Sequence, residues 1–213
     1  MKYFYFLFIF FLTSCIEIID DLKINNDGSG TFKYTLNLSS SKIKVKSILS
    51  LDSLYGEKIP KENNIKQKIT ELKNKLKQQE GITNVIVTED YVNYIFKVQI
   101  DFLNVENLEK GLKNVFSQNE NNQQDWISFK NKTLLKRVPI FYLDEIKKFG
   151  EKEIDKLKTG TYTSITRLES KIDTFENDLS IRSKSNMSLM IKTTPDMLLI
   201  NKSILDNKII LEK

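Results

Sequence analysis

Residues 16–38, IEIIDDLKINNDGSGTFKYTLNL, decide which fold this sequence predicts. Residues 31–38 carry an aromatic or aliphatic side chain at every second position, as a strand with one buried face requires. Residues 16–25 alternate in the same way, except for a slip at residues 19 and 20. Between them, residues 25–30 are Asn, Asp, Gly and Ser, which tolerate the positive φ angles of a tight turn. The segment therefore predicts an antiparallel β-hairpin.

The rest of the sequence extends this hairpin into a mixed domain. A second hairpin is predicted within residues 85–102, with its turn at Glu89 and Asp90, and residues 126–138 read as extended. Asn104 is expected to cap a short helix. The other predicted elements are helices over residues 39–54, 63–80 and 141–157, an exposed loop over residues 117–125, and short strands over residues 162–168, 172–175, 179–181, 187–192 and 204–211. We therefore expect an α+β fold, an antiparallel sheet built from hairpins with helices packed on one face.

The domain organisation follows from length and from the absence of internal divisions. No exact repeat or low-complexity linker interrupts the chain. We expect residues 1–14 to be a signal peptide and residues 15–213 to form a single α+β domain, with a subdivision near residues 139–160 left open. The helix over residues 63–80 is rich in lysine and has two interpretations: it packs on the core, or it lies on a membrane surface. Its narrow aliphatic face favours core packing.

The stretch before the first hairpin, MKYFYFLFIFFLTSC, has the order of a secretory signal. Its apolar run of about ten residues would span about 15 Å as a helix, half of a hydrocarbon core, so a permanent transmembrane helix is not expected. Leu12, Thr13, Ser14 and Cys15 resemble the bacterial lipobox. The resemblance implies that a peptidase recognises Leu12, Thr13 and Ser14 and cleaves before Cys15, after a diacylglyceryl group is attached to its sulfur. The alternatives are an ordinary signal peptide with an incidental cysteine, or a free thiol in a core.

Composition excludes several classes of function. The chain has no histidine, which removes Ser-His-Asp and Cys-His catalysis and HExxH zinc sites. Its single cysteine cannot form an intramolecular disulfide. The net charge is +5, but only three of the 33 basic residues are arginine, the residue best suited to bidentate phosphate and guanine contacts. We expect no nucleic-acid partner.

Neighbouring acidic residues are the remaining material for acid-base or metal chemistry. They are Asp20 with Asp21, Glu89 with Asp90, Asp144 with Glu145, Glu151 with Glu153, and Glu176 with Asp178. Adjacent residues on a strand point to opposite faces, and the DGSG turn lacks the spaced acidic ligands of an EF-hand. Walker, GxGxxG and GxSxG motifs are also missing. We therefore expect solvated carboxylates, no catalytic residues, no metal, no cofactor and no enzyme activity.

Several motifs in order carry a family resemblance. After the lipobox cysteine come a strand entering DGSG, the segments EGITNV and DYVNYIFKVQIDF, Asn104, and a late Thr-Pro followed by Asn-Lys-Ile-Ile. This order resembles uncharacterised Bacteroidota-type envelope lipoproteins and is distantly similar to the LppM-type lipoprotein domain. The resemblance implies a membrane-tethered α+β module that interacts with lipid or with the envelope. The aromatic usual in the final strand is replaced here by Ile210 or Leu211, so a surface role for that end does not carry over.

Together these features predict a membrane-anchored bacterial lipoprotein of the cell envelope, acting as a non-catalytic binding or structural module. Its partner is the membrane, through an N-terminal diacylglyceryl-cysteine labelled by palmitate, with a lipid or an envelope protein as a further partner. The alternative is a carrier whose aromatic strands enclose an acyl chain between sheet and helices, although a closed core is favoured. Ile16 rather than Asp follows Cys15, which favours the outer membrane in a bacterium with two membranes.

Overall fold

The computed structural model describes residues 16–54, 56–116, 125–138 and 157–212. Leu12, Thr13, Ser14 and Cys15 lie outside these residues. So do nearly all of the helix predicted over residues 141–157 and most of the loop predicted over residues 117–125.

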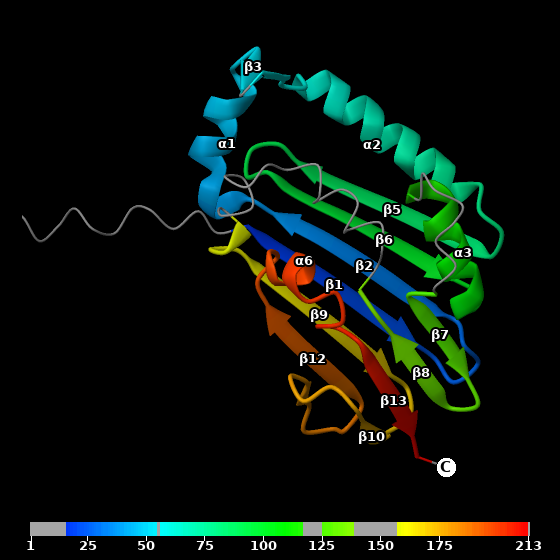
Figure 1. The fold of residues 1–213 in the computed structure, drawn as a ribbon. Coiled ribbons are helices and arrows are strands. Elements are labelled where there is room, and N and C mark those ends of the chain that lie inside the picture. The colour runs from blue at the N-terminus through cyan, green and yellow to red at the C-terminus, as the bar shows by residue number, and fades with distance from the viewer. Residues whose placement is uncertain (1–15, 55, 117–124, 139–156, 213) are drawn as a thin grey trace, which may run out of the picture.

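A seven-stranded sheet forms the main layer of the molecule (Figure 1). Its strand order is β11-β12-β9-β1-β2-β6-β5. Neighbouring strands are antiparallel, except that β1 and β9 run parallel, from Glu17 beside Thr161 to Ile24 beside Leu168. The strands are β1 Glu17–Ile24, β2 Gly30–Asn37, β5 Ile82–Asp90, β6 Ile95–Phe102, β9 Thr161–Leu168, β11 Ile181–Arg182 and β12 Ser188–Thr193.

The predicted first hairpin is confirmed as β1 and β2, paired so that Ile24 lies opposite Gly30. Gly28 has a φ of 86°, which only glycine adopts readily. The Asp27 side chain accepts a hydrogen bond from the Ser29 backbone N–H at 2.9 Å and closes the turn. Gly30 is needed for a different reason, because a Cβ there would lie 2.0 Å from the Lys23 carbonyl oxygen.

A second layer covers one face of this sheet (Figure 1). It contains a four-stranded antiparallel sheet in the order β10-β13-β8-β7, and the helices α2 and α3. Its elements are α2 Glu62–Lys77, α3 Val105–Phe116, β7 Ile127–Lys130, β8 Thr133–Lys136, β10 Ile172–Phe175 and β13 Asn207–Leu211. The predicted α+β class is confirmed, with one parallel strand pair and a second sheet that the sequence did not predict.

The core lies between the two layers. Alternate residues of β1 point into it, so Leu22 and Ile24 are fully buried. Leu76 of α2 and Leu112 of α3 close over them from the second layer. The lysine-rich helix α2 therefore packs on the core, as its aliphatic face predicts. A smaller cluster forms around Tyr162 and the short helix α6, Met197–Ile200.

Several predicted boundaries are wrong. The strand predicted over residues 204–211 begins only at Asn207, and two other cases have a clear local cause. The helix predicted over residues 39–54 is a 3-10 turn at Ser39–Ser41 followed by α1, Lys42–Leu49. It ends early because the chain folds back into the small hairpin of β3 Ser53–Leu54 and β4 Glu57–Lys58, with Gly56 at a φ of 87°.

Within the described residues, no helix is both long and apolar enough to cross a membrane.

The turn between β5 and β6 lies later than predicted, after Asp90 rather than at Glu89 and Asp90. The Asp90 carboxylate accepts hydrogen bonds from the backbone N–H groups of Val92 and Asn93, both at 2.9 Å. Tyr94 then takes a φ of 55° and returns the chain into β6. The aromatic and β-branched residues of this segment alternate like a strand, which hides the turn chemistry of Asp90 and Asn93 from a periodicity argument.

Candidate functional site

The described chain joins the sheet immediately after Cys15. The Ile16 carbonyl accepts a hydrogen bond from the Thr161 N–H at 2.7 Å, and β1 begins at Glu17. A Cβ on Gly160 would lie only 2.9 Å from the Ile16 oxygen, so this close approach requires glycine. Since consecutive Cα atoms are about 3.8 Å apart, any group carried by Cys15 is held within one residue of the sheet.

We call the end of the seven-stranded sheet where β1 begins the anchor end, after the lipid anchor that the sequence predicts at Cys15. Glu17 pairs there with Asn37, the last residue of β2, and with Thr161, the first residue of β9. Asn37 in turn pairs with Ile95, the first residue of β6. The opposite end holds the β1–β2 turn and the end of β6, where Gly30 pairs with Phe102. The β5–β6 turn and the connection from β2 to α1 therefore both lie at the anchor end.

Asp20 of β1 is the centre of a buried polar cluster. Its Oδ1 accepts hydrogen bonds from Lys136 Nζ at 2.5 Å and from Ser164 Oγ at 3.0 Å. Its Oδ2 accepts one from the Tyr162 hydroxyl at 2.5 Å. None of these four side chains is more than 4% exposed. Lys136 comes from β8 in the small sheet and the others from β1 and β9, so the cluster connects the two layers.

The Asp20 cluster is closed to solvent. Burial, and then the negative charge of Asp20, raise the pKa of Tyr162 well above its ordinary value, so its hydroxyl keeps the proton that it donates to Asp20. Lys136 Nζ also lies 2.7 Å from Ser164 Oγ, a pairing that serves as base and nucleophile in some hydrolases. A substrate would have to reach these atoms, but both side chains are buried and Lys136 is already bonded to Asp20.

A second buried acid, Glu109, lies on the core-facing side of α3. Its Oε1 accepts hydrogen bonds from Lys113 Nζ at 2.7 Å and from the backbone N–H of Trp126 at 3.3 Å. Its Oε2 is buried and has no hydrogen-bond partner in the described part of the chain. Burial raises the pKa of the Glu109 carboxyl to about 7, although Lys113 opposes the shift.

Glu109 should make stability depend on pH. In the unfolded chain this carboxyl loses its proton near its ordinary pKa of 4.5, whereas in the folded chain it holds the proton up to about pH 7. The folded state therefore loses stability as pH rises from 4.5 to 7, by about 2 kcal/mol after allowance for solvent screening. Glu109→Gln should flatten this slope in urea unfolding at pH 5 and pH 8. Glu106→Gln, an exposed change on the same helix, should keep it, and equal slopes in both variants would contradict the assignment.

A pocket of 510 Å³ lies at the opposite end of the sheet from the anchor end. Its polar lining comes from the β1–β2 turn, the start of α3, the β7–β8 turn and the segment after β9, namely Asn26, Asp27, Asn104, Glu106, Asn131, Lys132 and Ser170. Hydrogen bonds from Ser29 to the Asp27 carboxylate lower its pKa. This lining suits a small polar molecule better than an acyl chain.

The predicted site residues Leu12, Thr13, Ser14 and Cys15 lie outside the described residues. The expectation that the acidic neighbours are solvated holds for Glu89, Glu176 and Asp178, which are exposed. It is wrong for Asp20, which is buried, and Asp21 is 23% exposed and forms an ion pair with Arg167. The acidic residues predicted at positions 144, 145, 151 and 153 lie outside the described residues. The break in alternation at residues 19 and 20 was the signal of the buried Asp20, because position 20 faces inward with Leu22. In the part of the chain described here, no group of three or more His, Cys, Asp or Glu side chains could share a metal ion.

Comparison with known proteins gives a distant structural match. No protein-family model and no curated protein sequence matches the chain. The folded domain of LppM from Mycobacterium tuberculosis, solved by NMR, is similar in structure with a TM-score of 0.45 and 9% sequence identity, over 96% of this chain and 94% of that domain. This domain, of the type that the sequence resembles, is a distant structural neighbour of the chain.

Proposed function

We propose that this chain is a bacterial envelope lipoprotein in which a diacylglyceryl group on Cys15 Sγ holds a non-catalytic α+β module at a membrane. The observation that carries the proposal is the position of Cys15. It follows an apolar run and the small residues Thr13 and Ser14, and the next residue, Ile16, already accepts a hydrogen bond from Thr161 of the sheet. A lipid on Cys15 would therefore attach the sheet to the bilayer with almost no intervening tether.

The role of the module is to bind or to support other envelope components. The buried state of Ser164 and Lys136 argues against hydrolase chemistry at the Asp20 cluster. The alternative role, enclosure of an acyl chain between sheet and helices, is not favoured by the pocket near Asp27, since most of its lining side chains are polar. In a bacterium with two membranes, Ile16 after the cysteine supports the outer membrane as the location.

Resistance to washing tests the anchor. Two or three acyl chains stabilise membrane binding by about 0.8 kcal/mol for each buried methylene, and salt does not weaken this term. The full chain expressed in a bacterium should therefore stay with the membrane pellet in high salt and at alkaline pH, and should dissolve only in detergent. Release by salt alone would show that charge rather than lipid holds the protein, and would contradict the proposal.

A further inference from the structure

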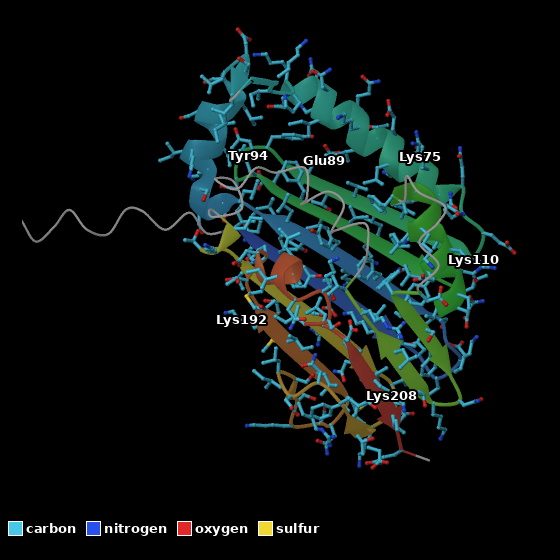
Figure 2. The ribbon with its side chains drawn as sticks, in the orientation of Figure 1. Lys75, Glu89, Tyr94, Lys110, Lys192 and Lys208 are labelled. Carbon is cyan, nitrogen blue, oxygen red and sulfur yellow. The ribbon has the colours of Figure 1, made fainter. Side chains whose placement is uncertain are left out.

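The anchor end carries the two most exposed large apolar side chains of the described residues. Ile43 of α1 and Val92 of the β5–β6 turn are each 79% exposed. The segments that carry them meet at this end of the sheet, where the Leu38 N–H, just before the turn into α1, donates to the Tyr94 carbonyl at 3.0 Å. Figure 2 shows Tyr94 on the side of the molecule where α1 stands.

Helix α1 lacks the packing that normally stabilises a helix. None of its eight residues is buried. A helix this short is marginal by itself in water, and most helices gain their stability from an apolar face covered by something else. Ile43 is almost fully solvated, while Val45, Ile48 and Leu49 are only half-buried.

All the charged residues of α1 are lysines. Lys42, Lys44 and Lys46 are exposed, and none forms an ion pair with an acidic side chain in the residues that the structure describes. Lysines beside exposed aliphatic side chains are the pattern of a segment at an anionic lipid surface, where the apolar groups enter the acyl boundary and the ammonium groups meet phosphates. The lysines and Ile43 thus lie on one helix that leaves the sheet at the end where β1 begins, whereas Val92 follows the acidic residues Glu89 and Asp90 in the β5–β6 turn.

We propose that the anchor end is a membrane-binding face, in which Ile43 and Val92 insert into an anionic phospholipid bilayer and Lys42, Lys44 and Lys46 bind its headgroups. This inference deepens the proposed function, because a lipid on Cys15 would bring this end of the sheet to the bilayer. The face then fixes how the domain stands: β1, β2 and β6 rise from the membrane, and the polar pocket near Asp27 faces away from it.

Depth-dependent quenching tests the face directly. The processed lipoprotein, with its one native cysteine acylated, is given a single thiol-linked NBD fluorophore by Ile43→Cys or Val92→Cys. It is then reconstituted in vesicles of phosphatidylglycerol and phosphatidylcholine with brominated acyl chains. The fluorescence of both probes should fall at least about twofold. An interfacial segment buries its apolar face about 5–10 Å deep, which brings the probes close to the brominated acyl chains.

Leu103→Cys provides the matched control. Leu103 is 59% exposed and directly follows β6, whose eight residues separate it from the anchor end by about 25 Å. Its probe should not be quenched. If the probes at positions 43 and 92 are quenched no more than the probe at 103, the inference is wrong. If they shift to the blue without quenching by brominated lipid, a second copy or another protein covers the face, and the inference is equally wrong.

Charge reversal tests the lysines. The triple change Lys42→Glu, Lys44→Glu and Lys46→Glu should restore the fluorescence of the position 43 probe about twofold, as should neutral phosphatidylcholine vesicles. The same charge change at Lys75, Lys77 and Lys110, the first and last of which Figure 2 shows on the side opposite α1, should leave the quenching intact. Equal quenching in neutral vesicles would overturn the role of the lysines.

The two proposals fail separately. The mass of the N-terminal peptide reports whether Cys15 carries lipid, whereas the quenching reports where Ile43 and Val92 lie. A chain without lipid whose probes are still quenched in anionic vesicles would overturn the proposed function and support the face. A lipidated chain with unquenched probes would do the reverse.

Discussion

Replacing Lys136 by methionine is expected to lower the free energy of unfolding by about 3–5 kcal/mol. The change keeps most of the side-chain volume but leaves the Asp20 carboxylate buried without its cation. Asp20 would keep only the hydroxyls of Ser164 and Tyr162 as donors. Urea unfolding, followed by the fluorescence of the single, buried tryptophan Trp126, measures the loss.

Two further variants separate the buried pair from a general effect of losing lysine. Lys208→Met removes a lysine from the neighbouring strand β13, where the side chain is 45% exposed and 3.7 Å from Glu176, and should change stability by less than about 1 kcal/mol. Adding Asp20→Asn to Lys136→Met should recover part of the loss, since no unpaired charge then remains in the core. If Lys136→Met costs no more than Lys208→Met, Asp20 is not buried against Lys136.

Replacing Cys15 by alanine is expected to abolish labelling by palmitate and to leave the precursor uncut. Alanine has no sulfur to form the thioether, and the peptidase that the lipobox resemblance implies acts only on the lipidated precursor. Ser14→Ala is the matched control, because it keeps a small residue before the cysteine and should keep both the label and the cleavage. Equal labelling of wild type and Cys15→Ala would contradict the lipobox interpretation.

The local parts of the fold could be predicted from sequence. The first hairpin depends on alternation next to a turn built from Asn, Asp and Gly, and the helix capped by Asn104 depends on a hydrogen bond over three residues, from the Asn107 N–H at 2.8 Å. The parallel pairing of β1 with β9 could not be predicted, because Glu17 and Thr161 are far apart in sequence and no local pattern indicates that they pair. The second sheet was hidden for the same reason.

The buried acids left weaker signals. Asp20 and Lys136 each occupy an inward position of an alternating strand, next to Leu22 and Leu134 respectively. Glu109 occupies the apolar face of α3. A charged residue at such a position indicates a buried partner, but which charges meet depends on the packing of two sheets that are distant in sequence. The exposed surface of the anchor end could not be predicted either. Ile43 is exposed because no other element covers α1, and this depends on the tertiary packing.

The mass of the N-terminal peptide of the protein, purified from bacterial membranes, tests the central claim most directly. The account predicts a first residue of Cys15, heavier than cysteine by at least a diacylglyceryl group, with Leu12, Thr13 and Ser14 removed. A chain that still begins at Met1, or one that begins at Cys15 with an unmodified thiol, would contradict it.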